Sequence, residues 1–262
     1  MRYQMTQPAA GPLPRLRFRC GRATGAILLF LALLAGSGCR PGSDRSDYFP
    51  LDAGWSWRYR VTSEIKNLGK EHAETLVANR GTIAVDDRKV VPRMYQDGHR
   101  YYYAAQDDGV LLVADRAVGE EARPAQPDQF VLKYPLDPGT SWSVESQTYL
   151  LRRQIFSPTA VIMVPIRAPI SMTYTIEGKD DVVRVPAGTF RNCLRIHGTA
   201  TAMRDLGERI GEAEVNVDVI EWFAPGVGFI KMVRKEETRP ESHAGGSMTI
   251  ELQSLNKRSW FN

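Results

Sequence analysis

The sequence predicts an all-β protein: one curved antiparallel sheet or half-barrel of about ten to twelve strands, with little helix. Apolar and polar residues alternate in segments such as EVNVDVIEWF at 214–223, which is the period of a half-buried strand. Asp97-Gly98 and Asp108-Gly109 are typical of tight hairpin turns. No long segment shows the 3.6-residue period of an amphipathic helix.

Taken in order, the strands are predicted from the same alternation. In the first of them, Trp55, Trp57, Tyr59 and Ile65 share one face, and the polar residues share the other. The further segments are 89–96, 99–106, 110–116, 190–203, 214–223, 228–237 and 248–255. Between them, 119–129 reads GEEARPAQPDQ, which predicts a polar loop because it holds two prolines and almost no apolar residue.

A motif occurs twice, as FPLDAGWSW at 49–57 and YPLDPGTSW at 134–142, with six of nine positions identical. Its Asp-Pro-Gly or Asp-Ala-Gly core suits a turn whose glycine has positive φ. We interpret each copy as a rigid corner that starts a strand with a tryptophan anchor; a ligand-gripping loop used twice is the alternative. The β domain would then span 48–262 and consist of two related halves, 48–118 and 131–262, joined by the polar loop.

The first 38 residues predict export. Five arginines precede the apolar run AILLFLALLA at 26–35, which is too short to cross a membrane but long enough for a signal peptide. The following LLAGSGCR resembles a lipobox, so we expect cleavage before Cys39, lipid attachment and acylation at Cys39, and a tether over 39–47. Ordinary cleavage that leaves Cys39 as a terminal thiol is the alternative. Arg40 after the cysteine favours the periplasmic face of the outer membrane.

The basic charge of the chain resides in the leader. Residues 1–38 hold five of the 34 basic residues and no acidic residue, so the remainder carries 29 bases and 30 acids. Nucleic-acid binding depends on neutralising phosphates, and we therefore expect no nucleic-acid partner. The four histidines share no metal-binding spacing, and no cofactor motif occurs, so neither a metal nor a cofactor is expected.

One apolar stretch does not fit a central strand. IFSPTAVIMVPIRAPI at 155–170 contains Pro158, Pro165 and Pro169, and each proline removes a backbone donor. We expect an edge strand or a loop that covers the open end of the sheet, or one that reaches toward lipid or a partner protein. The candidate contact residues are Phe156, Ile162, Met163 and Ile166.

The remaining thiol is Cys193, which shares a strand face with Arg191, Arg195 and His197. Nearby cations can activate a thiol, but the sequence shows no third orienting group. We interpret Cys193 as a small packed residue, and we expect no catalysis.

The segments VPAGTFRNCLRI at 185–196 and EWFAPGVGFIKM at 221–232, together with the twofold PLDxGxSW motif, resemble a large group of uncharacterised bacterial exported proteins and lipoproteins akin to the TapB-like families of unknown function. The resemblance covers 48–240. It implies a β-rich periplasmic domain and no particular activity.

Two functional classes remain open. The first is a binding module whose concave apolar face takes up a lipid or another apolar ligand, with 155–170 as its lid. The second is an envelope interaction protein that binds a partner through a sheet edge or through 155–170. A large apolar cavity would favour the first class, whereas a filled core with an exposed apolar patch would favour the second.

Overall fold

A computed structural model describes residues 47–257 except 86–87, 157–158, 207–210 and 240–244. All described residues belong to one compact unit spanning 41–262. The expected signal peptide, Cys39 and nearly all of the expected tether lie outside the described residues. Within the described part of the chain, no helix is long and apolar enough to span a membrane.

The all-β prediction is confirmed, since the described residues form fifteen strands and no helix. Every strand pairing is antiparallel, and twelve strands follow one continuous path in a single sheet, with β3 attached beside β4. The strands are β1 (Ser56–Ile65), β2 (Gly69–Asn79), β3 (Ile83–Val85), β4 (Arg88–Tyr95), β5 (Arg100–Gln106), β6 (Gly109–Arg116), β7 (Arg123–Lys133), β8 (Ser141–Gln147), β9 (Arg152–Phe156), β10 (Val161–Pro165), β11 (Pro169–Val185), β12 (Gly188–Asp205), β13 (Glu212–Ala224), β14 (Gly228–Arg239) and β15 (Gly246–Asn256).

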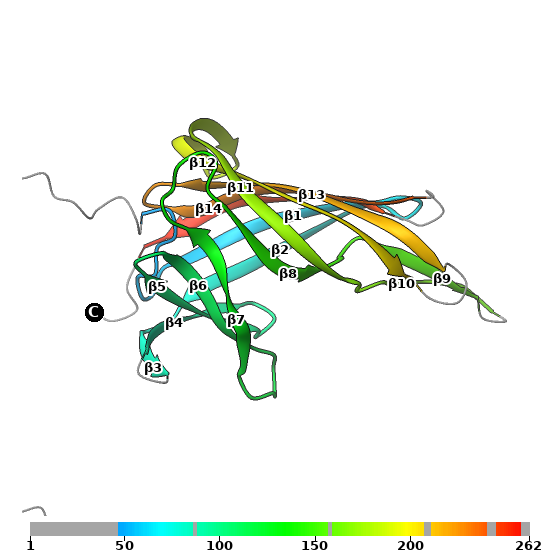
Figure 1. Ribbon diagram of the computed structural model, residues 1–262, viewed down its shortest axis with the longest axis horizontal. Coiled ribbons are helices and arrows are strands. Elements are labelled where there is room, and N and C mark those ends of the chain that lie inside the picture. Colours follow the sequence, from blue (N-terminus) through cyan, green and yellow to red (C-terminus); the bar gives the residue numbers. More distant parts are fainter. Residues whose placement is uncertain (1–46, 86–87, 157–158, 207–210, 240–244, 258–262) are drawn as a thin grey trace, which may run out of the picture. The chain divides into compact units, whose positions relative to one another are not determined.

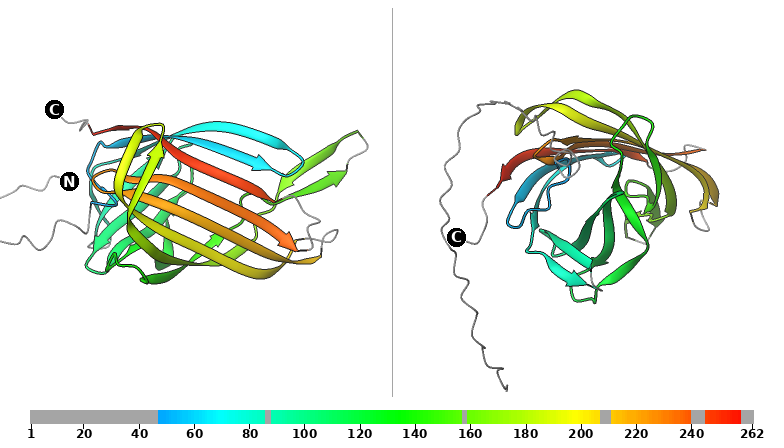
Figure 2. Two further views of the ribbon diagram at one scale, coloured as in Figure 1. Left: turned by 90° about the horizontal axis from the view of Figure 1, so that it is seen from above. Right: turned by 60° about the vertical axis from the view of Figure 1, so that its left-hand side comes forward.

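The sheet order is β7-β6-β5-β4-β2-β1-β15-β14-β13-β12-β11-β8. The sheet curves so strongly that β4–β7 face β12–β14 across its interior (Figures 1 and 2). Its terminal strands β7 and β8 meet, and Lys133 of β7 donates to the Ser141 carbonyl of β8 at 3.4 Å. The two ends of the sheet therefore nearly close on each other.

Apolar side chains of the concave face fill two adjoining layers. One layer joins β11, β12 and β13 through buried residues such as Met172, Ala200 and Val217. The other brings Tyr103 of β5 and Leu132 of β7 against Phe223 of β13, which are far apart along the sheet. The second layer requires a curved sheet, because only a curved sheet lets opposite strands bury the same core.

One segment differs from its sequence prediction. The loop expected at 119–129 is shorter, because β7 already begins at Arg123 and pairs with β6. Its prolines, Pro124 and Pro127, are tolerated because β7 is the last strand of the sheet path, where an unpaired edge needs no backbone donor. The existence of two related halves stays a prediction.

Both copies of the repeated motif adopt a corner before a strand. Gly54 and Gly139 have φ of 80° and 92°, the left-handed region that the predicted turns require. Trp57 and Trp142 are buried, the first in a cluster with Ile230 and the second in the layer that contains Phe223. This agrees with the interpretation of the motif as a structural corner.

Candidate functional site: the root of the projecting arm

The residues 148–168 form a hairpin that projects beyond the main sheet, and we call it the arm. Its strands β9 and β10 pair only with each other. Toward the sheet the ladder continues, because Thr148 N donates to Ala168 O at 2.9 Å and Ile166 N donates to Leu151 O at 3.0 Å. Figure 1 shows β9 and β10 extending from one end of the sheet.

The arm lies at the opposite end of the sheet from the point where the described chain begins. Leu150 of the arm root donates a hydrogen bond to Glu236 of β14. Glu236 is opposite Gly246 of β15, and Gly246 is opposite Ile65, the last residue of β1. Asp47, the first described residue, instead accepts a hydrogen bond from Gly226, beside the start of β14. We call the two ends the arm end and the corner end.

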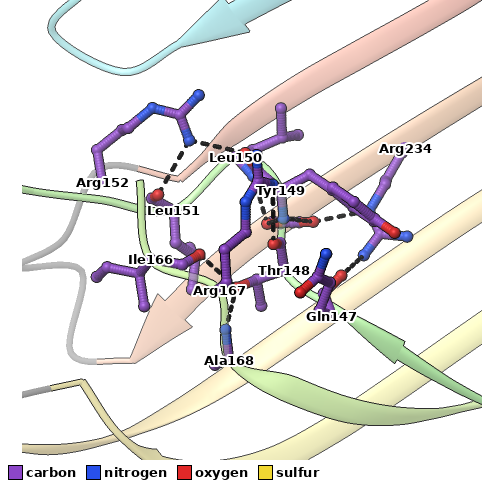
Figure 3. A network of polar contacts seen from close by, with 11 residues as sticks. Gln147, Thr148, Tyr149, Leu150, Leu151, Arg152, Ile166, Arg167, Ala168 and Arg234 are labelled. Atoms are coloured by element: carbon purple, nitrogen blue, oxygen red, sulfur yellow. Dashed lines mark hydrogen bonds and ion pairs between the residues drawn. The ribbon is translucent and has the colours of Figure 1, made fainter. Parts of the chain in front are cut away.

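A buried ion pair on β14 holds the arm root. Arg234 and Glu236 are 4% and 0% exposed, and Arg234 Nε donates to Glu236 Oε1 at 2.7 Å. The Glu236 carboxylate also accepts from Tyr149 N at 2.8 Å and from Leu150 N at 2.7 Å. Arg234 Nη2 donates to the Gln147 carbonyl at 2.9 Å. Figure 3 shows these contacts converging on one short stretch of backbone.

The pairing follows from the alternation of β14. Met232 lies on the concave face in the apolar layer, so Arg234 and Glu236, two and four positions later, lie on the same face. A buried charge is costly unless it is paired and its remaining hydrogen-bonding positions are filled. The backbone of 147–150 fills them, and this explains why a loop can be held so deeply inside the sheet.

Aromatic and hydroxyl contacts complete the root. Two guanidinium groups lie over the Tyr149 ring, with Arg234 Cζ 4.7 Å and Arg167 Cζ 5.2 Å from its centroid. Thr148 Oγ1 donates to Ile166 O at 2.7 Å and accepts from Ala168 N at 2.9 Å. Both strands of the arm are thus tied together where they leave the core (Figure 3).

Beyond the root, the arm is apolar and basic. Ile155 and Ile162 are 41% and 50% exposed, and the outer edge of neither β9 nor β10 pairs with a described strand. The range 148–168 contains three arginines and no acidic residue. Burial, and then the charge of Arg167, lower the pKa of Arg152, while the more weakly acting carboxylates of Glu236 and Glu71 raise it.

The predicted contact residues fall in different places. Ile162 is exposed on the arm and Met163 is partly exposed, whereas Ile166 packs against the apolar layer at the root. The Phe156 side chain lies outside the described residues. The structure therefore separates Ile166, which stabilises the root, from Ile162 and Met163, which project with the arm.

Cys193 of β12 is opposite Asp181 of β11 and is fully buried in a cluster with Val183 and Ile230. Burial raises the pKa of its thiol to about 11, so the reactive thiolate is scarce at neutral pH. Among the described residues, no group of three His, Cys, Asp or Glu side chains is placed to hold a metal ion.

Sequence reasoning missed Arg234 and Glu236. The segment KMVRKEE at 231–237 places charged residues on both faces of the strand, so alternation alone could not show which charges point inward. One signal was present in the sequence. Arg234 and Glu236 have opposite charges and are two positions apart, so they share one face of the strand and can form an ion pair there.

No protein-family model matches the sequence, and no curated protein matches it. Two solved structures are similar. One is a protein of Parabacteroides distasonis provisionally described as a lipoprotein, with 12% identity and a TM-score of 0.42, over 81% of this chain and 100% of that chain. The other, from Bacteroides fragilis, is provisionally described as exported, with a YmcC-like fold; its identity is 10% and its TM-score 0.38, over 80% and 99% of the two chains. These values are too low to support a conclusion about function. The resemblance to TapB-like families stays a prediction.

Proposed function

We propose that this chain is a non-enzymatic lipoprotein of the bacterial cell envelope, anchored through Cys39 on the periplasmic face of the outer membrane, whose arm binds a partner protein. The observation that carries the proposal is the arm itself: a strand pair with unpaired outer edges and exposed isoleucines, held in place by a buried ion pair.

Unpaired strand edges with apolar side chains are normally shortened, charged or covered, because they pair readily with other chains. The outer edges of the arm are unpaired, and its root is held to the sheet by hydrogen bonds. A partner protein can add a strand to an exposed edge of this kind. The three arginines limit pairing of the arm with a second arm and favour a partner with acidic side chains.

The placement of the arm favours a protein over the anchoring bilayer. The ten residues of β1 span about 33 Å, and the arm lies beyond their far end. The expected tether between Cys39 and the corner end has eight residues and reaches at most about 28 Å. The tether holds the corner end close to the membrane. The arm, at the opposite end of the domain, therefore points away from the membrane.

Uptake of an apolar ligand is the weaker candidate. The concave apolar layers are filled, since residues such as Leu151, Met172 and Leu132 are fully buried against their neighbours. The exposed apolar surface lies on the arm instead. A filled core with an exposed apolar patch is the combination expected for an interaction protein.

Site-specific photocrosslinking in living cells tests the proposal. A photoreactive residue at position 162 or 155 should yield one discrete protein adduct, whereas the equally apolar and more exposed position of Val118 should not. Ile162→Ser should abolish the adduct formed from position 155, and Met203→Ser, a change of an exposed residue on the main sheet, should leave it. Adducts of equal yield from 118, or none from the arm, would contradict the proposal.

The anchor has its own test. Cells fed a palmitate analogue should label the chain, and Cys39→Ser should remove the label and release the protein from the membrane fraction. A labelled Cys39→Ser variant would contradict lipid attachment at this residue.

A further inference from the structure

The two outer edges of the arm differ in the backbone donors that they offer. In an antiparallel ladder, opposite residues that hydrogen-bond to each other alternate with opposite residues whose N–H and C=O groups point outward. Ile166 N donates to Leu151 O at 3.0 Å, one position beyond the opposite residues Pro165 and Arg152. Ile166 and Leu151 are therefore a bonded pair, and the backbone groups of Pro165 and Arg152 point outward.

The same alternation continues along the arm. Gln154 is opposite Met163, and Phe156 is opposite Val161, so the backbone groups of these four residues also point outward. The outer edge of β9 thus presents three N–H donors, those of Arg152, Gln154 and Phe156. The outer edge of β10 presents only two, because its third outward residue is a proline, which has no N–H.

Prolines protect the β10 edge but not the β9 edge. Pro165 removes a donor at the end of β10, and Pro169 begins β11 directly after the arm. The Pro169 carbonyl already accepts from Arg204 Nε at 2.6 Å. Prolines on an edge strand commonly prevent its pairing with another chain. Residues 147–156 contain no proline, so β9 has the edge on which an added strand can form a continuous ladder.

One face of the arm combines exposed apolar side chains with a cation. Ile155 and Ile162 are opposite each other and are 41% and 50% exposed. Arg153 and Val164 are opposite each other two positions along and therefore share this face; Arg153 is exposed and Val164 is half-buried. A strand added to β9 would place its own side chains beside Arg153 and Ile155.

We propose that the partner of the arm adds a strand to the outer edge of β9, and that this strand carries an acidic residue two positions from an apolar residue. The acidic residue pairs with Arg153, and the apolar residue packs on Ile155. This inference rests on the proposed function, because it names the edge and the partner chemistry of the same arm. The range 148–168 contains three arginines and no acidic residue, which favours an acidic strand over a second copy of the arm.

Proline substitutions at one opposite pair test the choice of edge. The N–H groups of Gln154 and Met163 both point outward, so Gln154→Pro and Met163→Pro each remove one outer donor and leave the ladder within the arm intact. The photoreactive residue stands on the unchanged strand, at position 162 for Gln154→Pro and at position 155 for Met163→Pro. Gln154→Pro should reduce the yield of the partner adduct by about tenfold, the cost of roughly one hydrogen bond. Met163→Pro should keep the yield within about twofold of wild type.

The adduct formed from position 155 tests the partner chemistry. Mass spectrometry of its crosslinked peptide should identify a strand with an acidic residue two positions from an apolar residue. Arg153→Glu should abolish the adduct, and replacing the mapped acidic residue of the partner by lysine should restore it. Arg191→Glu, a change of an exposed arginine on β12, is the matched control and should leave the adduct.

The outcomes separate this inference from the proposed function. An adduct that survives Gln154→Pro, or one that is lost in Met163→Pro, would overturn the assignment to β9 and leave the arm as the partner-binding site. An adduct between two copies of this chain, or a crosslinked strand without the acidic residue, would overturn the partner chemistry. No adduct from the wild-type arm would overturn this inference and the proposed function together.

Discussion

Two buried arginines fasten the two ends of the sheet in different ways. At the corner end, Arg93 donates from Nε to Asn79 Oδ1 at 2.7 Å and from Nη2 to Pro50 O at 2.8 Å. At the arm end, Arg234 donates to the Glu236 carboxylate and to Gln147 O. Both stack on aromatic rings, but only Arg234 has a carboxylate partner.

The difference follows from what each arginine holds. Arg93 holds the first corner, whose Phe49 and Trp57 are themselves buried, so neutral acceptors and ring faces suffice. Arg234 holds the root of an arm whose buried apolar residues, Leu150, Leu151 and Ala168, all lie at the root, while Ile155 and Ile162 farther out are exposed. The arm root needs charge-assisted hydrogen bonds to the Tyr149 and Leu150 amides, which Glu236 supplies. The buried ion pair therefore occurs at the end of the sheet from which the arm projects.

The largest expected effect is at the arm end. Glu236→Gln should destabilise the protein by roughly 3–5 kcal/mol, because it leaves Arg234 buried without a countercharge. Urea unfolding measures this, and Glu237→Gln, the exposed neighbour, should stay within about 0.5 kcal/mol of wild type. If Glu236→Gln changes the free energy of unfolding by less than about 1 kcal/mol, the ion pair does not hold the arm end more strongly than neutral contacts hold the corner end.

Glu221 is the inward charge that neither arginine neutralises, and it should make stability depend on pH. Its pKa of about 7 in the folded state exceeds the ordinary value of 4.5, so between these values the folded state holds a proton that the unfolded state has lost. Stability should therefore fall as pH rises from about 4.5 to 7, by roughly 3 kcal/mol.

Urea unfolding at pH 5 and pH 8 tests this sign. Glu221→Gln should remove most of that decline and unfold at higher urea than wild type at pH 8, while Glu214→Gln should keep the wild-type slope. A wild-type protein that gains stability between pH 5 and pH 8, with the gain abolished in Glu221→Gln, would contradict the assignment.

At the corner end the expected cost is smaller. Arg93→Met should lower the free energy of unfolding by about 2 kcal/mol, since neutral hydrogen bonds and ring contacts are lost but no buried countercharge is stranded. The same urea experiment ranks it against Glu236→Gln. If Arg93→Met costs as much free energy of unfolding as Glu236→Gln or more, the contacts of Arg93 stabilise the protein at least as strongly as the Arg234–Glu236 pair. That result would contradict the expected difference between the two ends.

The smallest effect on stability should come from the arm surface. Ile162→Ser alters a side chain that is 50% exposed, so the free energy of unfolding should change by less than about 0.5 kcal/mol. A thermal melt checks this. A large loss of stability would show that Ile162 packs against the domain instead of projecting from it.

The sequence predicted the fold better than the site, for physical reasons. Alternation and turn chemistry are local, so β4–β6 and the β13–β14 hairpin could be placed from segments such as 110–116 and 228–237. Most of the proline-broken stretch 155–170 lies outside the main sheet, as expected, but Pro169 and Ile170 begin β11, which lies between β12 and β8 in that sheet. The site depends instead on which faces meet across the curved sheet. Glu236 and Tyr149 are 87 positions apart, and no local pattern joins them.

Amide hydrogen exchange at the arm root tests the central claim most directly, which is that the Arg234–Glu236 pair fixes the arm. In the wild-type protein, the Tyr149 and Leu150 amides should be protected and should exchange only through unfolding of the sheet. In Glu236→Gln they should exchange much faster, while the amides of β5 keep most of their relative protection. Rapid exchange of both amides in the wild-type protein, or unchanged protection in Glu236→Gln, would contradict the account.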